Sequence, residues 1–439
     1  MNYPETSPES AKLYDRAKAV MPGGNTRTTV YFDPFPIYAV RGEGCRMWDA
    51  DGHVYLDCIN NFTSMIHGYA TPSINAVVRD QLALGTAFGA PTPSEIDLAE
   101  LLVLRLPSVD HVRFTNSGTE AVMMAIKAAR AFTGRPKIAK IEGAYHGSYD
   151  YAEVSLDSTP DNWSNTPASI AYAKGTPQGV LDDVLVLPWN DIATAQAVIA
   201  EHGPQLAALL IDPLPNRAGL IPARQDYLTA LAKAARAAGV LLIFDEVISF
   251  RLGYSGAQGL LEVAPDLTVL GKIIGGGFPV GAVGGRADVM SVFDPTRGKP
   301  ALPHGGTFSA NPVTMRAGLA SMQALTPASF ERLDTIGETV RQGINAAFAR
   351  HSLAGVCVGL GSLFKVHFTD QPVTDYRSVY PNAEARRKLG IFHMALLNRG
   401  ILAAGYGLFA LSTPMTDSDI TEIIIAVDEA LAEVSRQYG

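Results

Sequence analysis

Two short apolar runs do most to limit how this chain can fold. Leu206 to Ile211 and Val240 to Asp245 are almost continuously apolar up to the closing aspartate. A strand has this composition when helices cover both of its faces, as in a parallel sheet. Further strands, with helical segments between them, are predicted near residues 111–115, 137–142, 183–187, 267–270 and 281–284. This order of elements predicts an α/β fold with a mainly parallel central sheet.

The two ends of the chain predict a second, smaller domain. The chain has 439 residues, about three times the length expected of one domain. Asp51-Gly52 predicts a β-hairpin with a two-residue turn, and such a hairpin is not stable alone. Beyond residue 315, helices are predicted near 313–325, 328–350, 384–399 and 416–436, and strands near 354–368 and 407–412. We expect residues 1–60 and 316–439 to form a small α+β domain, and residues 61–315 a large one.

Local signals mark where helices begin. Ser7 followed by Pro8 predicts a capped helix that ends near Val20. Thr92 and Glu95 have the spacing of a capping box ahead of another helix. The longest irregular stretch, residues 155–179, is a candidate lid over a site.

Charge and composition exclude several classes of function. The 35 basic and 43 acidic side chains give a net charge of −8, and no Lys/Arg-rich run occurs, so we expect no nucleic-acid partner. The three cysteines form no CxxC pair and the nine histidines no HxxxH or HExxH pattern, so no metal is expected. The polar, acidic N-terminus and the shortness of the apolar runs predict a cytoplasmic protein without a membrane contact.

A polar turn at Ser117-Gly118-Thr119 follows a predicted strand and precedes a strongly helical run. Such a turn directs backbone N–H groups and two hydroxyls toward one point at a helix N-terminus, which is the geometry that binds a phosphate. The same residues would also make a simple helix cap, so the turn alone leaves both interpretations open.

Asp245 and Lys272 are the next residues that can carry chemistry. Asp245 ends an apolar strand, and the carboxyl ends of such strands open onto the ligand crevice of an α/β sheet. Lys272 is enclosed by apolar residues and glycines, so desolvation can lower its pKa and make it a nucleophile. Taken singly, the aspartate could cap a loop or bind a metal, and the lysine could lie at the surface.

Other cofactors fail on spacing. A P-loop would need Gly at position 266 and Ser or Thr at position 273, where this chain has Asp and Ile. The glycines at 275–277 do not form the dinucleotide fingerprint. Neither ATP nor NAD is therefore favoured.

A phosphate turn, a strand-end aspartate and an enclosed lysine, in that order, are the three parts that a pyridoxal phosphate site needs. With these residues, the chain resembles the class III (fold type I) aminotransferases, and within them the group similar to glutamate-1-semialdehyde aminomutase. The resemblance runs from about Pro22 to the C-terminus. The matching stretches are Asn116-Ser117-Gly118-Thr119-Glu120-Ala121, Gly143-Ala144-Tyr145-His146-Gly147, Phe244-Asp245-Glu246-Val247, Pro265-Asp266-Leu267-Thr268-Val269-Leu270-Gly271-Lys272, Gly284-Gly285-Arg286 and Gly306-Thr307-Phe308-Ser309-Ala310-Asn311-Pro312.

The resemblance implies which residues hold the phosphate. Ser117, Gly118 and Thr119 would bind it within one chain, and Thr307 would reach it from the neighbouring subunit. A homodimer with sites at its interface is therefore implied.

The resemblance also implies a role for the residues around the ring. Asp245 would keep the pyridine nitrogen protonated, and Lys272 would form a Schiff base with the cofactor. Tyr145 would stack on the ring with His146 beside it, and Val247 would pack on the other face. Asp212, where the family usually has a glutamate before a proline, is expected in the same site.

Substrate recognition is matched less completely. Arg27, in the segment Pro22-Gly23-Gly24-Asn25-Thr26-Arg27, matches an arginine that binds a substrate carboxylate through two parallel hydrogen bonds; the alternative is a solvated loop arginine. Arg217 stands where the aminomutases carry a small polar residue, so we expect an extra cation in the pocket. Tyr406 replaces the glutamate of the aminomutases or the second arginine of the similar β-phenylalanine aminotransferases.

The resemblance implies an aminotransferase that moves an amino group from a carboxylated amine, a β-amino acid or a related amino acid, to a 2-oxo acid. The shortened segment Ser249-Phe250-Arg251 is shared with the β-phenylalanine aminotransferases and weakens the aminomutase interpretation. A glutamate-1-semialdehyde 2,1-aminomutase is the first alternative. A non-catalytic binding or regulatory protein of the same fold is the second, and the intact Lys272 and Asp245 argue against it.

Overall fold

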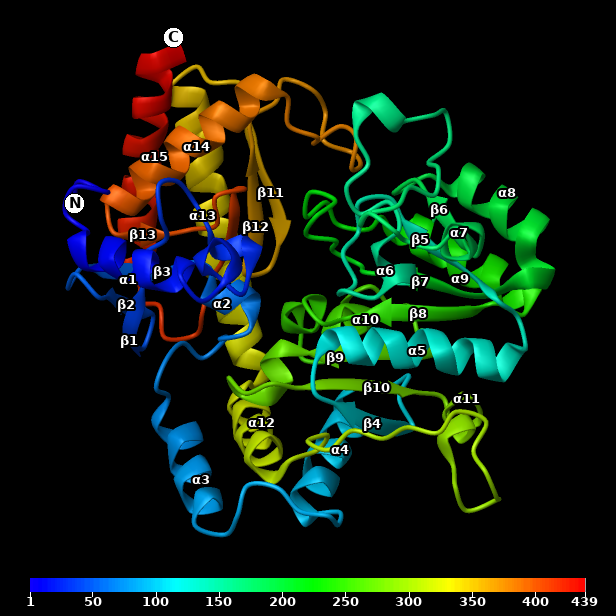
Figure 1. Cartoon of the computed structure of the whole chain (residues 1–439). Helices are drawn as coiled ribbons and strands as arrows, with labels where there is room; N and C mark the ends of the chain where they lie inside the picture. The colour runs from blue at the N-terminus through cyan, green and yellow to red at the C-terminus, as the bar shows by residue number, and fades with distance from the viewer. Residues whose placement is uncertain (439) are drawn as a thin grey trace. The chain divides into compact units, whose positions relative to one another are not determined.

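The computed structural model of the chain describes residues 1–438 and divides into two compact units. The small unit comprises Met1–Pro72, Arg332–Asp370 and Pro381–Gly439, and the large unit comprises Ser73–Glu331 and Gln371–Tyr380 (Figure 1). The predicted boundaries at residues 60 and 315 remain a prediction about domains; the chain passes between the two units at Pro72 and Glu331. None of the described helices is long and apolar enough to cross a membrane.

A seven-stranded sheet forms the centre of the large unit (Figure 1). In spatial order its strands are β4 (His111–Thr115), β10 (Gly281–Gly285), β9 (Leu267–Gly271), β8 (Leu241–Asp245), β7 (Leu206–Ile211), β5 (Lys137–Ile141) and β6 (Val184–Leu187). All neighbours pair in parallel except β10, which is antiparallel to both β4 and β9. Only residues 272–280 connect β9 to β10, too few for the crossover that a parallel pair requires. The predicted mainly parallel α/β sheet is confirmed.

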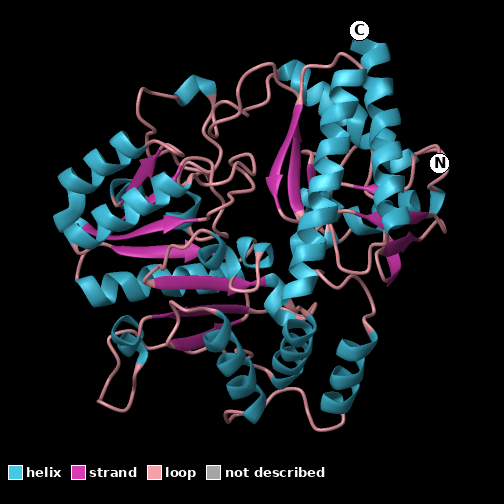
Figure 2. Cartoon of the chain, turned by 180° about the vertical axis from the view of Figure 1, so that it is seen from behind, coloured by secondary structure: helices cyan, strands magenta, loops and turns pink. Residues whose placement is uncertain are grey.

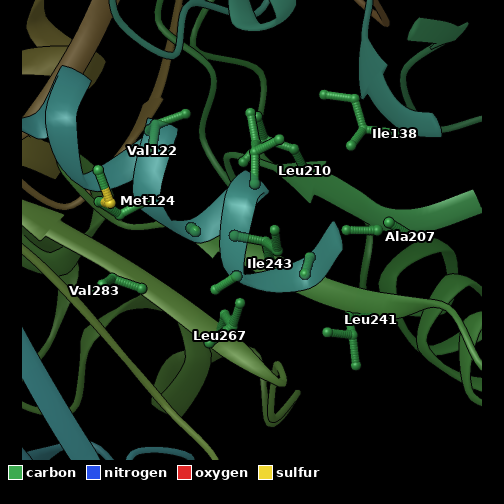
Figure 3. Close-up of a cluster of buried hydrophobic side chains, with 14 of the residues drawn as sticks. Val122, Met124, Ile138, Ala207, Leu210, Leu241, Ile243, Leu267 and Val283 are labelled. Carbon is green, nitrogen blue, oxygen red and sulfur yellow. The ribbon is translucent and has the colours of Figure 1, made fainter. Parts of the chain in front are cut away.

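Side chains alternate between the two faces of the central strands, and each face has its own core. In β8, Leu241 and Ile243 belong to one buried cluster, whereas Leu242 and Phe244 belong to the other. Figure 3 shows the first cluster, in which Val122 and Met124 lie over strand residues such as Ile243. Burial on both faces explains why β7 and β8 are apolar throughout.

Helices cover both sheet faces (Figure 2). α5 (Gly118–Thr133) and α11 (Ala287–Met290) contribute to the first core, and α8 (Ile192–His202) and α9 (Gln225–Ala238) to the second. The remaining helices of the large unit are α3 (Pro72–Leu82), α4 (Pro93–Arg105), α6 (Asp150–Glu153), α7 (Gln178–Asp182), α10 (Gly256–Leu260) and α12 (Pro312–Ala324).

The small unit combines two small sheets with long helices. The first sheet has the order β1 (Ala39–Glu43), β2 (Arg46–Asp49), β3 (Val54–Asp57) and β13 (Ile401–Leu402), and the second has β11 (Val356–Leu360), β12 (Leu363–His367) and β14 (Leu408–Ala410). Its main helices are α1 (Pro8–Lys18), α13 (Pro327–Arg350), α14 (Ala383–Asn398) and α15 (Asp417–Tyr438), and α13 begins in residues of the large unit. Strand β13 from near the C-terminus pairs with β3 from near the N-terminus.

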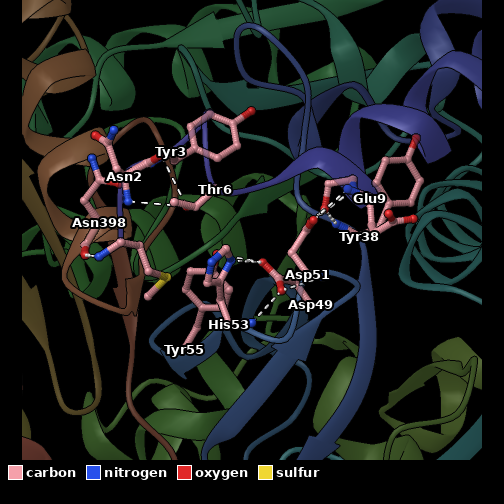
Figure 4. Close-up of polar contacts among 12 residues, drawn as sticks. Asn2, Tyr3, Thr6, Glu9, Tyr38, Asp49, Asp51, His53, Tyr55 and Asn398 are labelled. Carbon is pink, nitrogen blue, oxygen red and sulfur yellow. Dashed lines mark hydrogen bonds and ion pairs between the residues drawn. The ribbon is translucent and has the colours of Figure 1, made fainter.

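The hairpin turn caps helix α1, which corrects the predicted role of Ser7. The Ser7 side chain makes no cap hydrogen bond. Instead Oδ1 of Asp51 accepts from the backbone N–H of Glu9 at 2.6 Å, and Oδ2 accepts from the N–H of Ser10 at 3.0 Å (Figure 4). The hairpin itself is confirmed, but its turn has three residues rather than two, since the N–H of Asp49 donates to the carbonyl of His53.

The predicted capping box is wrong, although the helix that follows it is confirmed as α4. Thr92 occupies the cap position without a side-chain cap hydrogen bond. Its hydroxyl instead lies 3.0 Å from that of Ser94. The Thr92 hydroxyl is therefore hydrogen-bonded to a neighbouring side chain, and not to the backbone N–H that a capping box would use.

Candidate active site

The turn before α5 is fixed by reciprocal hydrogen bonds. Oγ of Ser117 accepts from the backbone N–H of Glu120 at 3.1 Å, and Oε2 of Glu120 accepts from the N–H of Asn116 at 2.7 Å. The helix-cap interpretation of Ser117 is therefore realised. A capped turn of this kind also places backbone N–H groups at the positive end of a helix, where an anion is stabilised.

Gly118 brings the turn into contact with the strands that carry the predicted aspartate and lysine. A Cβ atom at Gly118 would lie 3.0 Å from Cγ2 of Val247, and one at Gly271 would lie 3.6 Å from Cα of Gly118. Val247 follows Asp245 closely in the chain, and Gly271 directly precedes Lys272. Glycine at position 118 therefore allows three segments that are distant in sequence to meet.

Thr119 joins this group to the turn that contains Tyr145 and His146. The backbone N–H of Ser148 lies 3.3 Å from Oγ1 of Thr119. Gly147 has a φ of +86°, and a Cβ atom there would lie 2.4 Å from the same oxygen. Only glycine suits this position, because both the conformation and the space exclude a side chain.

Asp245 is buried and held in place by His146. Its Oδ2 lies 2.7 Å from Nδ1 of His146, and its Oδ1 accepts from the backbone N–H of Val247 at 3.1 Å. Because an ionised carboxylate only accepts, His146 carries its proton on Nδ1. Burial lowers the pKa of His146, although Asp245 opposes the shift. The buried imidazole and the backbone of Val247 together fix the position of the Asp245 carboxyl group.

Lys272 lies among charged groups at the same edge of the sheet. It begins a 3₁₀ helix, Lys272–Gly275, with a φ of +51°, a conformation that is strained for a residue with a side chain. Part of its surface is accessible, yet surrounding protein desolvates the amine and lowers its pKa to about 8, against the attraction of Asp245 and Asp212.

Asp212 shares this environment. It is 3% exposed, and its Oδ1 accepts from the backbone N–H of Leu214 at 2.9 Å. Burial first, and repulsion from Asp245 second, raise the pKa of Asp212 well above its usual range, while Lys272 opposes the shift. Asp212, Asp245 and Lys272 were predicted to share one site. In the structure each of the two carboxylates interacts electrostatically with the lysine, and they repel one another.

Glu246, next to Asp245, has a different role. Its Oε2 accepts from the backbone N–H of Ala257 at 2.6 Å, and its Oε1 accepts from the backbone and side chain of Gln258 at 3.1 and 2.9 Å. Burial raises the pKa of Glu246 to about 7 despite these bonds. Glu246 holds the start of α10, so of these two neighbouring carboxylates Asp245 is the one that belongs to the site.

The other predicted residues of the large unit are more open. Tyr145 is 45% exposed and Thr307 is exposed, while Val247 is half-buried. Nη2 of Arg217 lies 4.0 Å from Oδ1 of Asp157, which is a loose ion pair. These side chains are therefore at least partly accessible to a ligand.

Arg27 and Tyr406 belong to the small unit. Nη1 of Arg27 donates to Oδ1 of Asn61 at 2.8 Å, and the guanidinium carbon lies 5.7 Å from the centre of the Phe62 ring. Nζ of Lys365 lies 5.1 Å from the centre of the Tyr406 ring. The structure thus divides the predicted substrate residues between its two units.

Sequence analysis missed two features of this region. The first is the pairing of His146 with Asp245, which links positions 99 residues apart. The second is Lys140, a fully buried lysine whose pKa burial lowers to about 7. Nζ of Lys140 donates to the carbonyls of Ile141 and Val154 at 3.2 and 2.8 Å. Like Lys272, Lys140 stands among apolar residues in the sequence. Unlike Lys272, it is neither directly after a strand nor followed by a glycine-rich turn, so it was not singled out.

The residues fit pyridoxal phosphate. Among the described residues, Nε2 of His146 is buried without a hydrogen-bond partner. A desolvated lysine, a buried strand-end carboxylate and a capped helix N-terminus are the donor set for the aldehyde, ring nitrogen and phosphate of this cofactor.

Comparison with known proteins identifies the family. The family model described as Aminotransferase class-III matches residues 29–424. A β-phenylalanine transaminase from Variovorax paradoxus is 39% identical over 426 residues, covering 97% of this chain and 93% of the relative. A glutamate-1-semialdehyde 2,1-aminomutase from Symbiobacterium thermophilum is 38% identical over 436 residues, covering 98% of each chain.

Solved structures agree with the family match. The crystal structure of an ω-transaminase from Sphaerobacter thermophilus has a TM-score of 0.95 and 53% identity, covering 98% of each chain. The predicted fold type I architecture is thereby confirmed. The chain therefore belongs to the class III aminotransferases, enzymes that use pyridoxal phosphate to move an amino group from an amine donor to an oxo-acid acceptor.

Proposed function

We propose that this enzyme takes the amino group from a carboxylated amine, a β-amino acid or a related amino acid, and passes it to a 2-oxo acid. The observation that carries the chemistry is the grouping of the desolvated Lys272 with the buried Asp245 and Asp212, in which His146 holds Asp245. Similarity to the β-phenylalanine transaminase and the ω-transaminase supports the choice of donor.

The chain's own residues divide the work of binding the cofactor. Backbone N–H groups of Ser117, Gly118 and Thr119 bind the phosphate at the start of α5. Tyr145 and Val247 would lie against the two faces of the ring. Asp245, fixed by His146, would hold a proton on the ring nitrogen through its carboxylate.

Pyridoxal phosphate, when bound, supplies an aldehyde that joins to an amine and a ring that accepts electron density. Lys272 would supply the amine that joins to this aldehyde in the resting enzyme. Its pKa of about 8 leaves part of the population unprotonated near neutral pH, so Nζ can act as a nucleophile. With cofactor and donor bound, the same atom would move the proton at the donor carbon, as general base and then general acid.

We propose that Arg27 binds the donor carboxylate and that Arg217 and Tyr406 also take part in substrate binding. Among the described residues Arg27 forms no ion pair, and the one hydrogen bond that its side chain donates goes to the neutral oxygen of Asn61. A guanidinium in this state retains its charge and most of its donors for a two-point bond to a carboxylate.

We also propose a homodimer in which Thr307 reaches the phosphate of the neighbouring subunit. Phe308, next to Thr307, is 60% exposed, and Leu84 and Phe88 are 67% and 52% exposed. Leu84 and Phe88 line a pocket of about 520 Å³ between α3, α4 and α12 of the large unit. Exposed apolar side chains around a pocket are typical of a protein interface.

A glutamate-1-semialdehyde 2,1-aminomutase is the second candidate, favoured by the 38% identity to such an enzyme over nearly the whole chain. An aminomutase moves the amino group within one molecule and needs no separate acceptor. Glutamate 1-semialdehyde supplied alone to the loaded enzyme separates the two functions. Turnover to 5-aminolevulinate without an oxo acid would contradict our proposal.

The direct test is a panel of amines and 2-oxo acids assayed with the pyridoxal-phosphate-loaded enzyme and with Arg27→Ala. We expect carboxylated donors to be preferred by the wild type, and Arg27→Ala to raise their KM more than tenfold, since a charged two-point contact is lost. Equal KM values for both forms of the enzyme would contradict the proposed role of Arg27.

A further inference from the structure

A left-handed turn follows strand β3 in the small unit. The consecutive residues Asn60, Asn61, Phe62 and Thr63 have φ values of +53°, +47°, +54° and +75°. Left-handed backbone is strained for residues with a Cβ atom, especially for bulky and β-branched ones, and it normally occurs as single residues. Four in a row need an explanation, because such strain persists only where the surroundings enforce it.

Buried contacts at the base of the turn enforce this conformation. Oδ1 of Asp57, a residue 1% exposed, accepts from the backbone N–H groups of Ile59 and Asn60 at 2.7 and 3.0 Å. Nδ2 of Asn60 donates to the carbonyl of Ala410 at 2.5 Å. Asn60 and Thr63 are buried, whereas Asn61 is exposed and Phe62 is half-buried. The base is thus fixed, and the two central side chains are presented outward.

Both of these outward side chains contact Arg27. Oδ1 of Asn61 accepts from Nη1 of Arg27 at 2.8 Å, and the Phe62 ring lies 5.7 Å from the guanidinium carbon. The amide of Asn61 is itself oriented, because its Nδ2 donates to Oγ of Ser64 at 3.0 Å. Arg27 is therefore held at one edge by an amide and on one face by a ring.

The N–H donors of Arg27 that these contacts do not use are suited to bind an anion. A guanidinium has five N–H donors, and within the described residues Asn61 takes the only hydrogen bond that Arg27 donates. Its partner is neutral, so the positive charge is not compensated as it would be by Asp or Glu. Aromatic packing on a guanidinium face likewise leaves the donors in its plane available.

We infer that Asn61 and Phe62 are positioning residues of the carboxylate subsite, and that the left-handed turn exists to present them to Arg27. They orient the guanidinium so that its free edge meets the carboxylate of the amine donor. The inference rests on the proposed role of Arg27 and extends it to the two residues that set its geometry.

The test compares two donors that differ only in the carboxylate. β-Phenylalanine and 1-phenylethylamine have the same ring and amine, and 3-phenylpropanoate has the ring and carboxylate without the amine. KM and kcat for both amines, and the dissociation constant of 3-phenylpropanoate by calorimetry, are measured on the pyridoxal-phosphate-loaded wild type, Asn61→Gly and Phe62→Leu. Asn190→Gly is the matched control, because Asn190 is also left-handed, with a φ of +59°, but lies in the large unit.

We expect Asn61→Gly to raise KM for β-phenylalanine and the dissociation constant of 3-phenylpropanoate about tenfold, the scale of a lost hydrogen bond to a charged group. The kcat values and the KM for 1-phenylethylamine should stay within about twofold, since only ground-state binding of the carboxylate is lost. The melting temperature should not fall, because glycine suits the left-handed conformation. Phe62→Leu should give a smaller loss of about threefold.

Other outcomes have distinct meanings. Equal losses for both amines, or wild-type values in Asn61→Gly, would overturn the inference. If Arg27→Ala removes the preference for the carboxylated donor while Asn61→Gly retains it, only the positioning role is wrong. If Arg27→Ala also leaves the preference unchanged, the proposed role of Arg27 fails and the inference fails with it. A wild type that uses neither amine would contradict the proposed function, and 3-phenylpropanoate binding would still test the turn.

Discussion

At the scale of single residues, Lys272 is suited to catalysis because two opposing effects set the pKa of its amine. Burial disfavours the ammonium form, while Asp245 and Asp212 favour it, and the balance lowers the pKa from 10.5 to about 8. A lysine at this value can be unprotonated often enough to react and protonated often enough to return a proton. Asp245, held by His146 at 2.7 Å, is one of the two carboxylates that act on this amine.

The lowered pKa of Lys272 predicts how the stability of the cofactor-free protein changes with pH. Below pH 8 the amine is protonated in both states, so burying it costs stability. From about pH 8 to 10.5 the native state has released its proton and the unfolded chain has not, so stability rises with pH. The advantage of Lys272→Met over the wild type should therefore shrink by about 1.4 kcal/mol per pH unit in this window.

Urea unfolding of the cofactor-free proteins at several pH values measures this difference. Lys174→Met, at an exposed position, controls for the loss of a lysine as such. A difference between wild type and Lys272→Met that stays constant from pH 8 to 10 would contradict the assigned environment of the amine.

The positions of some site residues could be predicted from the sequence, whereas the contacts of others could not. The positions of Asp245, the last residue of β8, and of Lys272, directly after β9, were predictable because both strands are apolar and buried. The contact of His146 with Asp245 was not, since it depends on how the turn after β5 meets the end of β8. Arg27 was predicted from family resemblance alone, and its partners Asn61 and Phe62 depend on a left-handed turn that no local propensity favours.

At the scale of elements, helix α1 shows that a cap can come from a distant segment. Burial alone would raise the pKa of Asp51, but hydrogen bonds from the Ser10 hydroxyl and the N–H groups of Glu9 and Ser10 outweigh it and hold the pKa below its usual value. The hairpin turn thereby ties the first helix to the first sheet of the small unit (Figure 4).

This arrangement predicts opposite results for two similar substitutions. Asp51→Ala should lower the free energy of unfolding by about 1–2 kcal/mol, the usual value of a helix cap. Ser7→Ala should lower it by less than about 0.5 kcal/mol, because the buried Oγ of Ser7 has no hydrogen-bond partner among the described residues. The Asp51 contribution should vanish as pH falls through the carboxylate pKa.

Denaturant unfolding monitored by circular dichroism compares the two variants with the wild type at pH 7. If Ser7→Ala lowered the free energy of unfolding more than Asp51→Ala, Ser7 would be the cap, as the sequence pattern predicted. That result would contradict the proposed link between the helix and the hairpin.

Elements were predictable where burial determined their composition. The seven strands of the large sheet were predicted to within a residue or two, because their side chains are buried on one or both faces. Strand β1, whose residues are mostly exposed, and β13, with two residues, carry too little pattern to be predicted. The capping box at Thr92 failed because side chains near a helix start have several competing partners.

At the scale of the whole molecule, the chain does not divide at a single point. Both ends contribute to the small unit, and residues 371–380 return to the large unit within a C-terminal stretch. The predicted contribution of both ends rested on the hairpin being too small to stand alone. The return of residues 371–380 had no signal in the sequence, since it rests on long-range contacts such as the bond from Nε of Arg377 to Glu142 at 2.7 Å.

The proposed homodimer predicts linked losses of assembly and of cofactor. Phe88→Asp and Phe308→Asp each introduce a charge at an exposed apolar position and should shift the protein from dimer to monomer. The dissociation constant of pyridoxal phosphate should rise at the same time, because Thr307 of the neighbouring subunit would be lost. Phe132→Asp, at another exposed phenylalanine of the large unit, is the control and should change neither property.

Light scattering coupled to size-exclusion chromatography gives the mass, and titration with pyridoxal phosphate gives the affinity. A monomeric wild type that binds the cofactor fully would contradict the shared site. Dimers that persist in both charged variants would place the interface elsewhere.

We expect the cofactor to be joined to Lys272, which is partly accessible, rather than to the fully buried Lys140. Borohydride reduction of the pyridoxal-phosphate-loaded protein, followed by peptide mass spectrometry, marks the lysine that is joined to it. Lys140, with a pKa of about 7, is a stringent internal control because desolvation alone would make it reactive too. We expect the phosphopyridoxyl mass on the peptide containing Lys272. The same mass on the Lys140 peptide, or on neither peptide, would contradict this assignment.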